Sequence, residues 1–456
     1  MENNLFFDSK RYCVEELHAG TENIRYRAFR NITYVKRPVD EIQKLNIFVP
    51  EKYFAGEEIN GYGLRTAPIF LPNTVGGYKP GPAGEPCVNK EGQPNAMYLA
   101  LQHGYVVVSA GVRGRGSVDA EGRYIGAAPA VVCDMKAAVR FLRYFDKTIP
   151  GDKEKIITNG TSAGGALSAL MGATGNHPDY EPYLKEMGAA DTADHVFGAS
   201  CYCPITNLEH ADMAYEWEFG GIREYCKWNE QGKMSDKQIS LSEILAGAFP
   251  LYVNSLHLKD EEGQELSLSE NGEGTFQKKV EEFVIASACR EVKKGTDLSQ
   301  LSWITWQDGK ICGIDFKEYV RFRTRMKTTP AFDNITMGTA ENELFGDLDI
   351  RERHFTSFGY EHSEVMGELA EEQRIKMMNP MNYLKDDLAV KAKHYRIRHG
   401  AVDRDTSLAI PVILHTKLMN AGIDSDLEFP WGIPHAGDYD LNELFRWIDA
   451  IVTDNV

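Results

Sequence analysis

The spacing of apolar and polar residues changes several times along the chain, and each spacing predicts a type of element. Residues 24–50 alternate and then run apolar, which is typical of antiparallel strands that open a sheet. From residue 67 to about 206, short apolar runs such as 105–110 alternate with helical spacing, as over 96–103 and 127–145. This alternation of strands and helices predicts an α/β fold with a mainly parallel sheet.

The pattern changes at about residue 207, where long charged amphipathic helices begin, and the strand-helix alternation resumes near residue 395. We expect these long helices over 240–256, 276–294 and 316–327. After the resumption we expect strands over 394–400 and 426–429, a helix that ends at residue 420 and a final helix over 441–452. A long insertion between two core strands is the usual form of a lid. The predicted domains are therefore a core of residues 1–206 and 395–456 and an inserted cap of residues 207–394.

The stretch from Lys155 to Thr174 predicts a strand, a sharp turn and a helix. A short apolar run stops at Gly-Thr-Ser-Ala-Gly-Gly, in which the serine is Ser162, and small or helix-forming residues follow. Glycines around a serine permit a strained backbone and a close approach of strand and helix, so the hydroxyl of Ser162 should be exposed as a nucleophile. The N–H of Ala163 could then face a developing oxyanion. The alternative is a glycine-rich helix start with a capping serine.

A second glycine motif follows a predicted buried strand over residues 67–72. The next residues read Asn-Thr-Val-Gly-Gly-Tyr, with the glycine pair at Gly76 and Gly77. A loop in this position supplies the second oxyanion-hole N–H in α/β-hydrolases, because glycines let the backbone reach the substrate carbonyl. The alternative is an ordinary turn before the Pro/Gly-rich loop 79–95.

The partners of the serine should follow in the order acid, then histidine, on loops at the carboxyl ends of strands. An aspartate of the pair Asp403 and Asp405 meets the first condition, and spacing does not choose between them. His415 and His435 are the histidines that follow. His415 lies in an apolar run and is expected to be a packed core residue, whereas His435 lies on a Pro/Gly loop and is the predicted general base.

Composition narrows the possible partners. The formal net charge of −17 and the absence of basic runs argue against nucleic acid or an anionic membrane and favour a small-molecule partner. No window has the length of a membrane span, and the polar N-terminus has no signal-peptide core, so we expect a cytoplasmic protein. The eight cysteines and the scattered histidines lack ligand spacing, which predicts buried thiols and neither metal nor cofactor. The sequence predicts no oligomeric state.

Four motifs with their spacing resemble the bacterial tannases (tannin acyl hydrolases) of the lactobacillus type. The motifs are G-T-S-A-G-G-A-L-S, K-T-T-P-A-F-D-N-I-T-M-G-T-A-E-N-E-L-F-G, R-H-G-A-V-D-R-D-T and P-H-A-G-D-Y-D, and the resemblance spans nearly the whole chain. It implies an α/β-hydrolase that cleaves galloyl ester and depside bonds of gallotannins and simple gallate esters and releases gallic acid. Fungal tannases differ, because they carry cysteines beside the catalytic serine and histidine, where this chain has Thr161, Ala163, Pro434 and Ala436.

The resemblance also implies roles for individual residues. The catalytic acid of the family matches Asp403, and its three ring-binding residues match Lys327, Glu341 and Asp405. Two carboxylates and an ammonium complement the three hydroxyls of a galloyl ring, and buried polar groups should reject rings that lack those hydroxyls. The alternatives are a feruloyl or general carboxylesterase or a peptidase on the same fold, and a non-catalytic binding protein.

Overall fold

A nine-stranded sheet forms the centre of the computed structural model, which describes residues 4–227 and 230–453. The strands lie in the order β1-β2-β3-β5-β4-β6-β7-β12-β13. Their bounds are β1 Cys13–Ala19, β2 Glu22–Thr33, β3 Lys44–Pro50, β4 Pro68–Pro72, β5 Val106–Ala110, β6 Asp152–Thr161, β7 Gly198–Tyr202, β12 His394–Arg398 and β13 Asp424–Glu428. Pairing is antiparallel from β1 to β5 and parallel from β5 to β13. The predicted α/β class with a mainly parallel sheet is confirmed.

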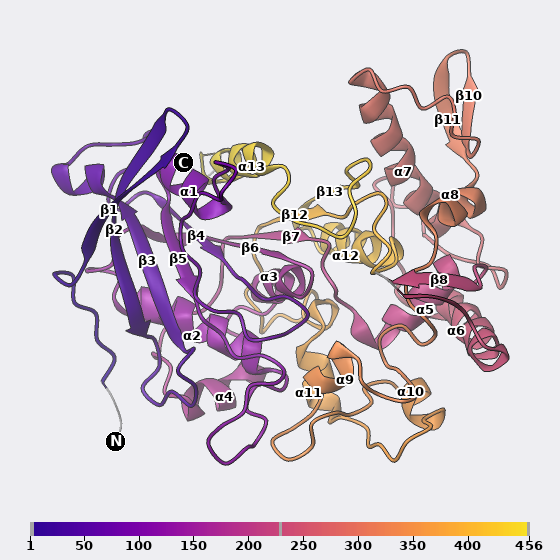
Figure 1. The fold of residues 1–456 in the computed structure, drawn as a ribbon, viewed down its shortest axis with the longest axis horizontal. Helices are drawn as coiled ribbons and strands as arrows, with labels where there is room; N and C mark the ends of the chain where they lie inside the picture. The colour runs from indigo at the N-terminus through magenta and orange to yellow at the C-terminus, as the bar shows by residue number, and fades with distance from the viewer. Residues whose placement is uncertain (1–3, 228–229, 454–456) are drawn as a thin grey trace.

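Helices cover both faces of this sheet (Figure 1). They are α1 Ala96–Gln102, α2 Ala130–Tyr144, α3 Ala163–Ala173, α4 Glu181–Glu186, α12 Ala409–Asn420 and α13 Leu441–Thr453. The central strands β4 and β5 are buried along their whole length, as expected of apolar runs between two helical layers. Because β4, β6, β7 and β12 are parallel neighbours, the loops that follow them gather at one edge of the sheet.

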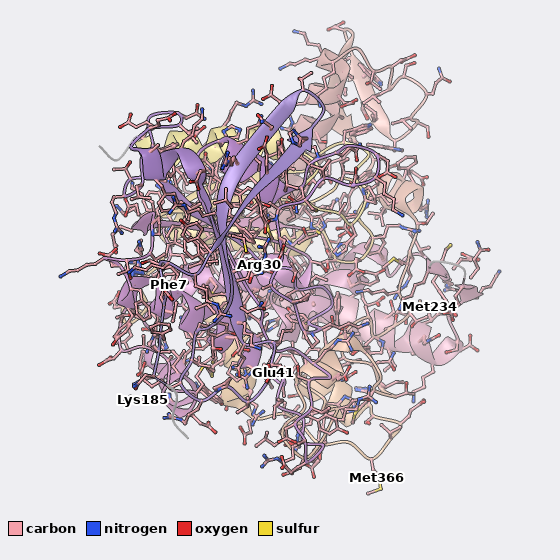
Figure 2. All side chains as sticks on the ribbon, turned by 60° about the vertical axis from the view of Figure 1, so that its left-hand side comes forward. Phe7, Arg30, Glu41, Lys185, Met234 and Met366 are labelled. Atoms are coloured by element: carbon pink, nitrogen blue, oxygen red, sulfur yellow. The ribbon has the colours of Figure 1, made fainter. Side chains whose placement is uncertain are left out.

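The antiparallel strands form the other end of the sheet. β1, which the sequence analysis did not predict, alternates between exposed and half-buried residues. Arg30 of β2, visible on this side in Figure 2, makes ion pairs with Glu15 of β1 and with Glu85. Charged pairs of this kind are common on edge strands, where they oppose pairing with other chains.

The segment between β7 and β12 lies beside the β12–β13 end of the sheet (Figure 1). Its helices are α5 Leu208–Phe219, α6 Asp236–Ser255, α7 Thr275–Lys293, α8 Phe316–Arg323, α9 Ala340–Leu344, α10 Ser357–Glu361 and α11 Glu372–Met377. Two hairpins were not predicted, namely β8 Glu224–Lys227 with β9 Glu230–Lys233 and β10 Ile304–Gln307 with β11 Lys310–Ile314. They have only four or five residues per strand, which is too short for a clear alternation.

The helix expected over 316–327 ends four residues early. Thr324 has a positive φ of 61°, and its N–H bonds to the carbonyl oxygens of Val320 and Arg321, which closes the last turn. The next arginine, Arg325, is fully buried in an ion pair with Glu216. Lys327 therefore lies in a loop rather than at a helix end.

The expectation that most cysteines are buried is wrong. Cys133, Cys201 and Cys203 are buried, and the other five are partly or fully exposed thiols. Cys201 lies in β7, whereas Cys203 follows the end of that strand at Tyr202 and adopts a positive φ of 35°. In the described parts of the chain, no helix is both long enough and apolar enough to span a bilayer.

Candidate active site

A strained turn between β6 and α3 carries Ser162. Its φ and ψ are 62° and −123°, in the left-handed half of the backbone map. A Cβ on Gly160 would come within 2.3 Å of the carbonyl oxygen of Gly164, and one on Gly164 within 2.4 Å of Asn73 Oδ1. Only glycine fits at either position, since strand and helix pass this close together. The alternative of a simple capping serine fails here, because the hydroxyl of Ser162 caps no helix N–H.

Ser162, His435 and Asp403 form a hydrogen-bonded chain. Ser162 Oγ lies 2.9 Å from His435 Nε2, and His435 Nδ1 lies 2.7 Å from Asp403 Oδ2. Asp403 follows β12, and His435 lies in the loop between β13 and α13. His415 is elsewhere, within α12, where its Nδ1 lies 2.9 Å from Ser425 Oγ. The structure thus brings together the three residues predicted as nucleophile, acid and base.

Burial and neighbouring charges shift the pKa values of Asp403 and His435 in opposite directions. Desolvation would raise the pKa of the fully buried Asp403, but the imidazoles of His399 and His435 and the N–H of Asp405 hold it well below the usual value. Burial would likewise lower the pKa of His435, but the Asp403 carboxylate raises it. An ionised aspartate beside the histidine is the arrangement that stabilises an imidazolium once the histidine has taken a proton.

The three backbone N–H groups that the sequence analysis proposed for an oxyanion have no partner within the described ranges 4–227 and 230–453. They are those of Ala163, Gly76 and Gly77. The Gly76–Gly77 loop is held from both sides. Arg115 Nε donates to the carbonyl oxygen of Gly77 at 2.5 Å, and the Asn73 amide donates to the carbonyl oxygens of Asn159 and Gly164 at 3.1 and 3.0 Å.

The three residues expected to bind the ring also come together, although they are far apart in sequence. Lys327 Nζ donates to Asp405 Oδ1 at 2.9 Å and lies 3.9 Å from the centre of the Phe332 ring. Glu341, in the first turn of α9, is buried rather than a surface carboxylate. Desolvation and the charge of Asp405 raise the pKa of Glu341, whereas Lys327 lowers it. The cluster is a partly shielded group of one cation and two carboxylates.

The cluster of Lys327, Glu341 and Asp405 contacts the hydrogen-bonded chain of Ser162, His435 and Asp403 through the backbone of Asp405. The backbone N–H of Asp405 donates to Asp403 Oδ1 at 2.8 Å, so one short loop supplies both aspartates. Sequence reasoning had not identified His399, whose Nε2 lies 3.5 Å from Asp403 Oδ2 and whose pKa burial lowers to about 4. Its position in the R-H-G-A-V-D-R-D-T motif is the signal that could have singled it out.

Cys203 is a further neighbour that the sequence did not indicate. Its Sγ lies 3.9 Å from His435 Nε2 and 3.4 Å from the carbonyl oxygen of Ala436. With Asp403 and His435 it forms a set of possible metal ligands whose donor atoms lie within 4.8 Å of one another. Since His435 already bonds both Asp403 and Ser162, the geometry matches a proton relay better than a metal site.

A family model and a curated esterase match parts of this chain. The BD-FAE family model matches residues 87–246, which include Ser162 and the strand-turn-helix around it. Esterase LipC of Mycobacterium tuberculosis is 40% identical over 70 residues, which cover 15% of this chain and 17% of that protein. The chain therefore spans only about a sixth of the length of this curated relative.

Solved structures match over nearly the whole chain. The tannin acyl hydrolase of Lactobacillus plantarum is 46% identical, with a TM-score of 0.96 and 99% of each chain covered. The tannase of Fusobacterium nucleatum is 44% identical, with a TM-score of 0.96 and coverage of 99% of this chain and 100% of that one. A tannin acyl hydrolase in complex with ethyl gallate is 46% identical, with a TM-score of 0.95 and coverage of 98% and 99%.

Proposed function

This chain belongs to the bacterial tannases, a family of serine esterases with the α/β-hydrolase fold, and on that premise we propose that Ser162, His435 and Asp403 hydrolyse galloyl esters. The substrates are simple gallate esters and the ester and depside bonds of gallotannins, and the product is gallic acid. The observation that carries this proposal is the chain of 2.9 and 2.7 Å contacts from Ser162 through His435 to Asp403, beside a partly buried cluster suited to hydroxyl groups.

The reaction proceeds in two halves. His435 Nε2 takes the proton of Ser162 as Oγ attacks the ester carbon, and it then gives that proton to the leaving alcohol. A water molecule, activated by the same nitrogen, attacks the acyl-enzyme and releases the acid with restoration of Ser162. Asp403 keeps His435 oriented and stabilises the imidazolium. The N–H groups of Ala163 and of Gly76 or Gly77 bind the oxyanion, and each such donor contributes roughly 3–4 kcal/mol in comparable sites.

Ring recognition falls to Lys327, Glu341 and Asp405. The carboxylates of Glu341 and Asp405 accept hydrogen bonds from phenolic hydroxyls, and the Lys327 ammonium donates to a phenolic oxygen. With a ring that lacks these hydroxyls, the partly buried groups lose partners, which disfavours ferulate-type rings. The segment 207–394, which contributes Lys327 and Glu341, acts as the cap of a core formed by residues 1–206 and 395–456.

Hydrolysis of a panel of methyl esters tests this proposal. Methyl gallate should have a kcat/KM about 100-fold or more above that of methyl ferulate, with methyl protocatechuate between them. Equal rates, or a preference for ferulate, would reassign the protein as a feruloyl or general carboxylesterase. Lys327→Ala and Glu341→Ala should lose the preference for gallate, and normal discrimination by either variant would remove that residue from the ring site.

Labelling of Ser162 by a fluorophosphonate separates an enzyme from a binding protein. We expect wild-type protein to be labelled and Ser162→Ala protein to stay unlabelled, because only an activated serine reacts rapidly with this probe. A natively folded wild-type protein that resists the probe would favour a non-catalytic binding role. A cytoplasmic location is also proposed, on the support of eight free thiols in the described chain, and cell fractionation tests it.

A further inference from the structure

The loop that carries both active-site aspartates is held by side chains of the cap. The hydroxyl of Tyr319 donates to the carbonyl oxygen of Ala401, and that of Tyr215 donates to the carbonyl oxygen of Arg404 at 3.1 Å. Tyr319 comes from α8 and Tyr215 from α5. The backbone of residues 401–408 is thus bonded to side chains of the cap.

A buried ion pair forms the centre of this attachment. Arg323 of α8 donates to the carbonyl oxygen of Asp403 and to Glu218 Oε1. Glu218 of α5 uses its other oxygen to accept from Ser407 Oγ at 2.6 Å and from the N–H of Leu408 at 2.8 Å. The pair therefore binds both ends of the segment 403–408: the Arg323 guanidinium donates at Asp403, and the Glu218 carboxylate accepts at Ser407 and Leu408.

Both charges are fully buried, with side-chain exposures of 0% for Arg323 and Glu218. Burial of two charges carries a large desolvation cost, and replacement by packed apolar groups is often neutral or stabilising. General stability is therefore a weak explanation for this pair. Its hydrogen bonds instead converge on the loop whose position decides where the Asp403 carboxylate meets His435.

We propose that Arg323 and Glu218 form a positioning pair, through which the cap sets the orientation of Asp403 and so the basicity of His435. The proposal rests on the catalytic roles proposed above. Neither side chain touches substrate or the reacting atoms. Displacement of the loop by loss of either residue lengthens the contact between Asp403 and His435, and a misplacement of about 1 Å at such a contact costs up to about 100-fold in rate.

The structure offers a matched control two residues away. Glu216, on the same helix α5, is also fully buried and also pairs with an arginine. Its partner is Arg325, two residues beyond the end of α8. Its other bonds go to Ser242 and Thr329, and none reaches the loop 401–408. Glu216→Gln and Glu218→Gln therefore remove equivalent buried charges, but only the second should disturb Asp403.

The test compares Glu218→Gln, Arg323→Lys, Arg323→Met and Glu216→Gln with wild-type protein. The measurements are the rate constant for fluorophosphonate labelling of Ser162, kcat and KM for methyl gallate and 4-nitrophenyl acetate, and the acid limb of kcat/KM. Glu218→Gln and Arg323→Met should lower the labelling rate and kcat on both esters by about 10- to 100-fold. They should also shift the acid limb to lower pH, because His435 loses part of its carboxylate partner. Arg323→Lys should have a labelling rate and a kcat between those of Arg323→Met and the wild-type protein. Glu216→Gln should have the wild-type labelling rate and an acid limb at the wild-type pH.

Wild-type labelling rates and an unshifted acid limb in folded Glu218→Gln and Arg323→Met proteins would overturn the positioning role, and so would an equal loss in Glu216→Gln. If Glu218→Gln does not fold, the comparison of Arg323→Lys with Arg323→Met decides, because the lysine retains the buried charge and the methionine removes it: equal, wild-type rates in both variants would overturn the proposal. The labelling and 4-nitrophenyl acetate measurements need no galloyl substrate. A wild-type protein that labels but ignores methyl gallate would therefore refute the proposed substrate and leave this comparison intact.

Discussion

Asp403 is the residue with the most contacts to other groups of the site. Its Oδ2 faces His435 and His399, its Oδ1 accepts the N–H of Asp405, and its carbonyl oxygen accepts from Arg323. Every one of these neighbours favours the ionised carboxylate or fixes its direction. The charge on Asp403 is in turn what raises the pKa of His435.

Replacement of Asp403 by asparagine should therefore change both the rate and its pH dependence. We expect kcat to fall by about 10³- to 10⁴-fold, because an amide neither holds the required tautomer nor stabilises an imidazolium. His435 must be neutral to accept a proton, so activity is lost as pH falls through its pKa. Without the aspartate charge that pKa drops, and the acid limb of kcat/KM should move to lower pH. Asp424→Asn, at an exposed carboxylate paired with His394, is the control and should keep the wild-type profile.

Glu341 gives a second pH dependence, this time in substrate binding. Burial and the nearby Asp405 raise its pKa, and only the ionised form offers two acceptor oxygens to phenolic hydroxyls. The KM for methyl gallate should therefore rise as pH falls through the raised pKa of Glu341. Glu341→Gln should have a higher KM that no longer depends on pH in that range. A variant whose KM still follows the wild-type pH curve would assign the titration to another group.

Among individual residues, those that belong to a motif could be predicted from the sequence. Those whose role depends on a partner far away in the sequence could not. Ser162, Asp403 and His435 occur in turn and loop motifs, and the structure joins them. Arg323 and Glu218 occur in ordinary charged helices, and only their meeting across 105 positions makes them a pair. Asp134 and Lys136 of α2 are similar cases, since both are buried beside partners from other elements.

Among the elements, the turn between β6 and α3 is tightly packed against its neighbours. It brings the carbonyl oxygen of Gly164, the amide of Asn73 and the backbone of Gly160 into direct contact. The bond between Asn73 and Gly164 also joins the nucleophile turn to the loop that carries Gly76 and Gly77. The nucleophile and the proposed oxyanion donors are therefore positioned by one set of contacts.

Gly164→Ala tests this coupling. The new Cβ would lie 2.4 Å from Asn73 Oδ1 and 2.7 Å from the carbonyl oxygen of Val75, so one of the two elements must shift. We expect labelling of Ser162 by a fluorophosphonate to slow by about 100-fold, together with a lower melting temperature. Gly247→Ala, in the middle of α6 with open space around it, is the control and should gain about 1 kcal/mol of stability without change in labelling. Unchanged labelling in both variants would show that the turn tolerates the shift.

Elements with a continuous apolar run or a clear helical spacing were predicted well, and short elements without either were not. The strand at β5 and the helices at α7 and α13 match their expected ranges within one or two residues. Several elements are too short for a periodicity to develop, since none has more than six residues. They are the strands β8, β9, β10 and β11 and the helices α9, α10 and α11. α8 ends early at the positive φ of Thr324, and the buried pair of Arg325 with Glu216 follows directly; no local pattern reveals that pair.

In the whole molecule, the proposed cap and the proposed core share buried polar contacts. Arg323, Tyr215 and Tyr319 of the cap all bond the backbone of the loop 401–408. Breaking them on unfolding of the cap would leave buried groups unpaired, which costs about 1–3 kcal/mol for each group. The two parts should therefore lose their structure together.

Urea unfolding measures this directly. Fluorescence of Trp217, in a variant whose other five tryptophans are replaced by phenylalanine, reports the segment 207–394, and fluorophosphonate labelling reports the Ser162 site of the core. We expect both signals to fall with one midpoint, since the contacts above cross the junction. Labelling that survives beyond the fluorescence transition would instead mean that the core stands alone. The sequence predicted the α/β class and the existence of an inserted segment, but not this shared set of bonds, because its members are spread from residue 215 to residue 408.

The hydrogen bond from the N–H of Asp405 to Asp403 Oδ1 has a consequence for the redesign of substrate range. A mutant library that varies Asp405 also perturbs the acid that serves His435, so gains in acceptance of new aromatic acids would be offset by slower turnover. Lys327 and Glu341 belong to the proposed ring site through other segments, and neither bonds Asp403 directly in the described structure. Diversification of these two positions, with residues 403–408 kept constant, is therefore the route by which new acyl groups could be admitted at full catalytic rate.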